Sequence, residues 1–157
     1  LGFDPLSYVV AFNAGAIIGI ALWGRASEGP LGRRGAVTLA ALSGVTLVPL
    51  FLLTSSAWLL FVGAGLMGAT GGGIWGMAPA YLTERFPTAV RGVGPGLSYH
   101  VGAAVGSATP FVLGRLQDGG MTTGGAMGAC IAISGVLVAV IIWLGPETRG
   151  RRFAATD

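Results

Sequence analysis

His100 is the residue best placed to do chemistry, because it is the chain's one histidine and stands within a long uncharged segment. If that segment is a helix beginning near Val93, the imidazole lies about 10–12 Å along it. Imidazole titrates near neutral pH, so a hydrated His100 could bind a proton or an anionic carboxylate. Alternatively, His100 stays neutral and makes one hydrogen bond between helices.

Other polar side chains near such a site could hold a substrate but offer no covalent chemistry. Tyr99, Ser98 and Asn13 are candidates for hydrogen bonds to a substrate. All six acidic residues stand outside the long apolar runs, so no intramembrane acid pair is expected. Cys130 is the chain's one cysteine and has no Cys/His cluster around it. We therefore predict a protein that is not an enzyme and has no metal or cofactor.

The composition places these residues in a membrane protein. Hydrophobic residues make up 53% of the 157 residues and charged residues only 10%, against about 25% in soluble domains. The mean hydropathy is +0.77. The pI of 9.8 does not indicate a nucleic-acid-binding protein, because the arginines fall in short clusters between apolar runs.

Five apolar segments of about 20 residues each are long enough to cross a bilayer as helices. They cover residues 6–23, 36–54, 58–80, 93–113 and 125–144, and a tail follows at 145–157. The segments alternate with short loops that carry nearly all the charge. The sequence therefore predicts an all-α membrane protein.

The arginines indicate the orientation of the five spans. Eight of the nine arginines lie in the loops 24–35 and 81–92 and in the tail, which must share one side of the membrane. Arg115 alone lies on the other side. Because basic residues accumulate on the cytoplasmic side, we expect the arginine-rich side and the C-terminus to be cytoplasmic.

Small residues distinguish the spans. Gly68, Gly72 and Gly76 repeat every four residues along span 58–80, a spacing that allows close helix packing. Span 93–113 is also rich in glycine and contains Pro95 and Pro110. We expect these two spans to pack tightly or to line a cavity, and spans 36–54 and 125–144 to face lipid.

Three loop motifs carry a family resemblance. Residues 24–34 read GRASEGPLGRR, residues 81–92 read YLTERFPTAVRG, and residues 146–151 read PETRGR. In this order and at this helix spacing they resemble the loop signatures of the major facilitator superfamily that follow its helices eight, ten and twelve. The first copy has one more residue between the acid and the second glycine than the family pattern.

The resemblance implies that the five spans are helices eight to twelve of the C-terminal six-helix bundle. It also implies that the loop residues stabilise the closed cytoplasmic side during transport. The residues concerned are Gly24, Glu28, Gly32, Arg33, Arg34, Glu84, Arg91, Glu147 and Arg149. Arginines retained only to set the orientation are the alternative.

Within the superfamily, the second loop and residues 94–102 most resemble the sialate- and lactate-type organic acid:proton symporters. The resemblance implies alternating-access transport of a small organic anion with protons. A symporter for sugars or other metabolites, and a truncated remnant that transports nothing, remain the alternatives. The expected partners are the lipid bilayer, the organic anion and proton, and the transporter helices that this sequence lacks. A bacterial inner membrane is the expected location.

Overall fold

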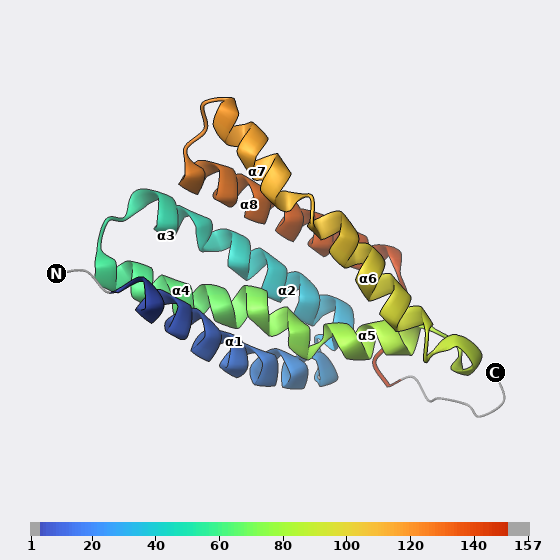
Figure 1. Cartoon of the computed structure of the whole chain (residues 1–157). Helices are drawn as coiled ribbons and strands as arrows, with labels where there is room; N and C mark the ends of the chain where they lie inside the picture. Colours follow the sequence, from blue (N-terminus) through green and yellow to red (C-terminus); the bar gives the residue numbers. More distant parts are fainter. Residues whose placement is uncertain (1–3, 151–157) are drawn as a thin grey trace.

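The computed structural model describes residues 4–150, all of whose regular elements are helices (Figure 1). Three charged residues of the tail lie outside the described residues: Arg151, Arg152 and Asp157. The helices, in chain order, are α1 (Pro5–Glu28), α2 (Gly32–Thr46), α3 (Val48–Leu53), α4 (Ala57–Gly71), η1 (Gly72–Gly76), α5 (Ala78–Arg85), η2 (Thr88–Val90), α6 (Gly94–Gly106), α7 (Thr109–Asp118), α8 (Thr123–Ile141) and η3 (Ile142–Leu144).

Within residues 4–150, four helical stretches are long and apolar enough to cross a membrane. They cover Pro5–Glu28, Gly32–Leu53, Ala57–Arg85 and Thr123–Leu144. The class predicted from the sequence, an all-α membrane protein, is confirmed. The fourth expected span, 93–113, differs because it forms two shorter helices, α6 and α7.

The break between α6 and α7 has a local cause. Pro110 has no N–H, so the carbonyl of Gly106 loses its usual helical donor. The hydroxyl of Thr109 replaces that donor at 2.7 Å, and the hydroxyl of Ser107 donates to the Ala104 carbonyl at 2.7 Å. Side-chain hydroxyls of this kind allow a broken helix to persist within a bilayer.

Helices α1 and α4 run side by side in closest contact, and glycines make this possible (Figure 1). A Cβ at Gly68 would overlap the carbonyl oxygen of Phe12, and one at Gly76 would overlap that of Ile20. A Cβ at Gly72 would come within 2.6 Å of the Ala16 Cβ. Backbones that approach this closely gain dispersion energy without bulky side chains between them.

The buried core lies around α2, which corrects one expectation. Ala36, Val37 and Ala40 of α2 pack with Met77 at the start of α5, and each is at most 5% exposed. The sequence predicted that span 36–54 faces lipid because it contains one glycine. The structure limits that prediction to one side of the span, because the alanines of α2 are buried whereas Leu39, Leu42 and Leu53 are exposed.

Helix α6 differs from the expectation of tight packing. Its residues are exposed from Gly96 onward, and α7 packs along α8 at the upper edge of the bundle (Figure 1). The glycines Gly96, Gly102 and Gly106 have open space around their Cβ positions within the described structure. The small face of this helix is therefore available to other groups.

Candidate functional site

The three arginine-rich loops meet at one end of the bundle and form a charge cluster, which consists of Ser27, Glu28, Arg33, Glu84, Glu147 and Thr148. Arg33 is at its centre. Its Nη2 lies 2.7 Å from Glu84 Oε1 and 2.6 Å from Glu28 Oε1, and its Nε donates to Glu84 Oε2 at 3.1 Å. The side chains of Arg33 and Glu84 are only 6% and 11% exposed, whereas Glu28 is 63% exposed. The fork-like pairing of Arg33 with Glu84 is therefore the buried part of the cluster.

Two buried hydroxyls complete the hydrogen bonds of this pair. Arg33 Nη1 donates to Ser27 Oγ at 2.7 Å, and Thr148 Oγ1 donates to Glu84 Oε2 at 2.6 Å. Ser27 and Thr148 are both 0% exposed. Neither residue was predicted to be functional, although both stand within the loop motifs quoted above. Ser27 and Thr148 reduce the cost of burying charge, because each supplies a partner that water would otherwise provide.

Glu147 fastens the tail to the first turn of α2. Leu31 provides no side-chain cap for α2. The backbone N–H groups of Arg33 and Arg34, in the first turn of this helix, instead donate to the Glu147 carboxylate at 2.9 and 3.1 Å. A carboxylate at a helix N-terminus also interacts favourably with the helix dipole. Gly32 has φ +67, and a Cβ there would lie 2.5 Å from Glu147 Oε2. Glycine at this position therefore serves both the turn and the approach of Glu147.

These contacts determine the pKa of Glu147. Partial burial alone would raise the pKa of this carboxyl, but backbone N–H groups of Arg149, Arg33, Arg34 and Thr148 outweigh burial and lower the pKa below its usual value. A group with a lowered pKa stabilises the fold fully above its ordinary pKa of about 4.3. That contribution is lost as the pH falls through the lower, folded value.

We therefore expect Glu147→Gln to reduce the acid sensitivity of the protein. The fall in melting temperature between about pH 7 and about pH 3 should be smaller in the variant than in the wild type. The exposed Asp118, at the other end of the molecule, provides the control Asp118→Asn, which should leave that difference unchanged. An identical fall in all three proteins would show that Glu147 contributes no pH-dependent stability.

The other predicted loop residues occupy the same end. Arg34 donates to the Gly145 carbonyl at 3.1 Å and lies over the Trp143 ring at 4.7 Å. Arg149 donates to the Gly29 carbonyl, and Arg91 donates to the Phe86 carbonyl within its own loop. A Cβ at Gly24 would lie 3.5 Å from the Gly76 carbonyl oxygen, where α1 meets η1. The first loop has one residue more than the family pattern. This residue is accommodated in a turn that is closed by a hydrogen bond of 3.1 Å from the Gly32 N–H to the Gly29 carbonyl.

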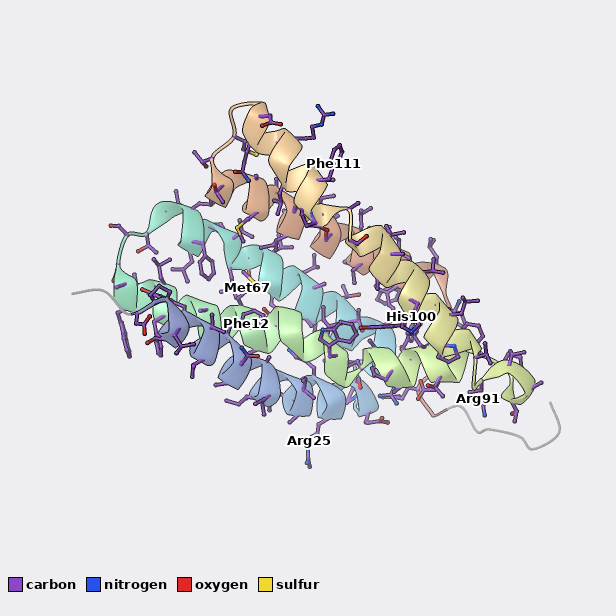
Figure 2. The ribbon with its side chains drawn as sticks, viewed as in Figure 1. Phe12, Arg25, Met67, Arg91, His100 and Phe111 are labelled. Atoms are coloured by element: carbon purple, nitrogen blue, oxygen red, sulfur yellow. The ribbon has the colours of Figure 1, made fainter. Side chains whose placement is uncertain are left out.

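The predicted substrate residues lie on two separate elements. Figure 2 shows His100 on α6, where Tyr99 meets it edge-on at 5.4 Å between ring centroids. Ser98 lines a cleft of about 520 Å³ between α5, α6 and α8. Within residues 4–150, the side chains of Ser98, Tyr99 and His100 make no hydrogen bond. Asn13 lies on α1 and donates to the Val9 carbonyl of its own helix at 2.8 Å.

Asn13 and His100 also differ in depth. Along α1, Asn13 is about 22 Å from Glu28, whereas His100 is about 9 Å from the start of α6 at Gly94. The structure therefore groups Ser98, Tyr99 and His100 on one helix and leaves Asn13 apart from them.

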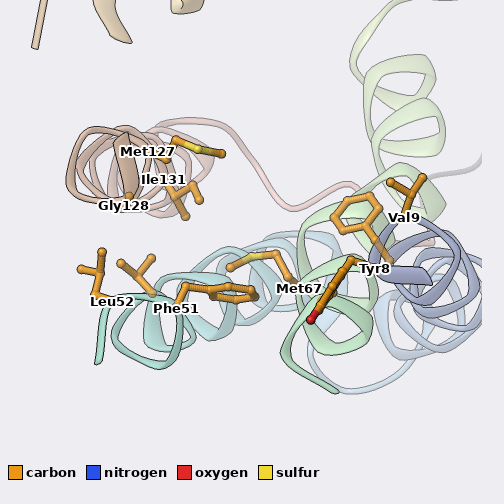
Figure 3. A pocket seen from close by; sticks show the side chains of 12 residues that line it. Tyr8, Val9, Phe51, Leu52, Met67, Met127, Gly128 and Ile131 are labelled. Carbon is orange, nitrogen blue, oxygen red and sulfur yellow. The ribbon is translucent and has the colours of Figure 1, made fainter. Parts of the chain in front are cut away.

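A second cavity lies towards the other end of the bundle. It has a volume of about 610 Å³, is open on one side, and is lined by residues of α1, α3, α4 and α8 that include Tyr8, Phe51, Met67 and Ile131 (Figure 3). Its lining is almost wholly apolar, and Tyr8 is its one side chain with a hydroxyl. Among the described residues, no group of three His, Cys, Asp or Glu side chains could hold a metal ion.

Comparison with known proteins gives the family. No protein-family model and no solved structure matches the chain. A cis,cis-muconate transport protein of Acinetobacter baylyi is 32% identical over 141 residues, which is 88% of this chain and 34% of that protein. A carboxylic acid transporter homologue of Saccharomyces cerevisiae is 33% identical over 110 residues, 70% of this chain and 18% of that protein. A sialic acid transporter of Escherichia coli is 39% identical over 72 residues, 45% of this chain and 18% of that protein.

These relatives and the three ordered loop motifs agree. The chain belongs to the major facilitator superfamily. It spans about a third of the length of the muconate transport protein and less of the other two. The proteins that it matches are transporters, so this member of the superfamily is an integral membrane protein and not an enzyme.

Proposed function

We propose that this segment works as part of a secondary transporter that moves a small organic anion across the membrane together with protons. The supporting observation is the similarity along 88% of the chain to a transporter of a carboxylic acid. Relatives whose names specify sialic acid and carboxylic acids support the same class of substrate. Monocarboxylates such as lactate or sialate are the substrates we expect, by alternating access between two helical bundles.

In this proposal the charge cluster is a gate. The hydrogen bonds of Arg33 with Glu84 and Glu147 connect α2 to α5 and to the tail. While these side chains are paired, this end of the bundle stays closed. A gate requires only that the two states differ by a few kcal/mol, which a buried charged cluster can supply. Because basic residues accumulate on the cytoplasmic side, the arginines support a cytoplasmic position for this end, and a bacterial inner membrane is the location we expect.

The direct test is uptake by the complete transporter in vesicles with an imposed pH gradient. Lactate, sialate, dicarboxylates and sugars are offered in turn. Uptake of an organic acid that requires an inward proton gradient supports the proposal. Uptake of sugars alone contradicts the substrate class, and no uptake of any compound contradicts transport.

His100 is the residue we expect to sense the proton. His100→Ala should change the ratio of uptake at about pH 6 to uptake at about pH 8 by about threefold, because it removes the side chain proposed to carry the coupled proton. Tyr99 is the neighbouring titratable group. His100→Asn, which keeps a hydrogen-bonding side chain but cannot titrate there, should change the pH profile similarly and preserve affinity better. Expression is measured alongside, and an unchanged pH profile and affinity would exclude this role.

A further inference from the structure

The cleft between α5, α6 and α8 has an apolar wall and a cationic end. Its volume is about 520 Å³, and the polar side chains that line it are Tyr81, Arg85 and Ser98. The rest of its lining is apolar and comes chiefly from α8 and η3: Val138, Ile141, Ile142 and Leu144. A ligand that fills this cleft therefore needs an apolar part and an anionic group.

Arg85, in the last turn of α5, has no acidic partner. Its Nη1 donates to the Tyr81 hydroxyl at 3.3 Å, and its guanidinium lies over the Tyr81 ring at 5.6 Å from the centroid. Within residues 4–150 no carboxylate is in ion-pair distance of Arg85, since the three glutamates of the charge cluster contact Arg33 instead. The exposed guanidinium therefore keeps most of its donors for an anion.

Gly145 brings a second guanidinium to the same place. A Cβ at Gly145 would overlap Arg85 Nη1, so Arg85 rests directly against the backbone where η3 ends. Arg34 donates to the carbonyl of Gly145 at 3.1 Å. The nearest carboxylate to Arg34 is that of Glu147, at 3.7 Å. Two positive charges therefore flank one glycine at the end of the cleft.

The depth of the cleft fits a phospholipid. Tyr81, Arg85 and Trp143 stand at the ends of two membrane-spanning stretches, where aromatic and basic side chains occupy the headgroup level. Acyl chains extend from this level towards the bilayer centre. The apolar wall from Leu144 back to Val138 follows the same direction for about 9 Å. A soluble anion would make no use of this wall.

We infer that the cleft binds an anionic phospholipid. Arg85 and the Tyr81 hydroxyl hold the phosphate, and one acyl chain lies along the wall formed by α8. Basic pockets between membrane-spanning helices bind lipid headgroups of this charge. A zwitterionic lipid binds less tightly, because its headgroup carries a cation that Arg85 and Arg34 repel. This lipid site is separate from the proposed transport function and holds whichever substrate is carried.

The test measures lipid binding to the purified complete transporter in detergent by native mass spectrometry. Phosphatidylglycerol and phosphatidylcholine with the same acyl chains are titrated separately. The wild type should bind phosphatidylglycerol about fivefold more tightly than phosphatidylcholine. Arg85→Gln should weaken phosphatidylglycerol binding by about fivefold. Arg85→Lys, which keeps the charge but loses the fork of donors, should retain part of the preference.

Arg25→Gln is the matched control, because it removes an exposed arginine from the last turn of α1, at the same end of the bundle. It should weaken phosphatidylglycerol binding by less than about twofold. Glycerol phosphate, which has no acyl chain, should not displace the lipid at equal concentration. Melting temperatures measured without lipid show that each variant is folded.

Three results would overturn the inference. The first is equal binding of the two lipids to the wild type. The second is a loss of binding in Arg85→Gln no larger than that in Arg25→Gln. The third is displacement of the lipid by glycerol phosphate, which would indicate a site for a soluble anion.

Discussion

Replacing Arg33 by methionine should lower the free energy of unfolding of the complete transporter by about 3 kcal/mol, the usual loss when one partner of a buried ion pair is removed. Methionine fills much of the same volume but provides no donor for Glu84, which is 11% exposed, or for the buried Ser27 hydroxyl. The carboxylate would then be buried without a charged partner. The melting temperature of the purified protein in detergent measures the effect.

Two further variants separate charge pairing from a general effect of losing an arginine. Arg25→Met removes an exposed arginine from the last turn of α1 and should cost less than about 1 kcal/mol. Arg33→Met combined with Glu84→Gln should be less damaging than Arg33→Met alone, because the unpaired charge is then absent. If Arg33→Met is no more harmful than Arg25→Met, the charge cluster does not stabilise this end of the bundle.

Replacing Gly68 by leucine should separate α1 from α4 and prevent the bundle from forming normally. A Cβ at Gly68 would overlap the backbone carbonyl oxygen of Phe12, which cannot move aside as a flexible side chain could. Overpacking of a core typically costs about 1–3 kcal/mol, and a clash between two helix backbones should be at or above the upper end. Reduced yield of the monodisperse protein and a lower melting temperature are the expected results.

Gly71 provides the control within the same helix. Apart from its chain neighbours and the nearby backbone of its own helix, no atom of the described structure lies within 4 Å of its Cβ position. Gly71→Leu should therefore be neutral or slightly stabilising, because leucine favours a helix more than glycine does. Equal behaviour of the two variants would contradict the close packing of α1 and α4.

The charge cluster shows what the sequence could predict. Glu28, Arg33, Glu84 and Glu147 all stand at the ends of apolar spans, and alternation of the spans places them on one side. Their pairing depends on side-chain geometry, and so does the role of Thr148, a neutral residue whose importance lies in its contact with Glu84. Charge and topology therefore predicted the location of the cluster, and only the structure could give its hydrogen bonds.

Helix packing was harder to predict from the sequence. The burial of α2 depends on Ala36 and Ala40, whereas the prediction that span 36–54 faces lipid rested on its low glycine content. The separation of Asn13 from His100 follows from helix depth, which hydropathy does not specify to within one turn.

The most direct test of the gate is the labelling of a single cysteine from the arginine-rich side. Ser98→Cys, in a Cys130→Ala background, places the thiol in the cleft lined by Tyr81 and Arg85 at that end. An impermeant maleimide is applied to vesicles of both orientations, with and without Glu84→Gln, which removes the charge of the buried carboxylate partner of Arg33 and keeps the shape of that side chain. If the charge cluster holds a cytoplasmic gate closed, Glu84→Gln should speed labelling from the cytoplasmic side about tenfold and slow it from the other side. Equal labelling rates in the two proteins would contradict the gate, and faster labelling from the outer side would contradict the orientation.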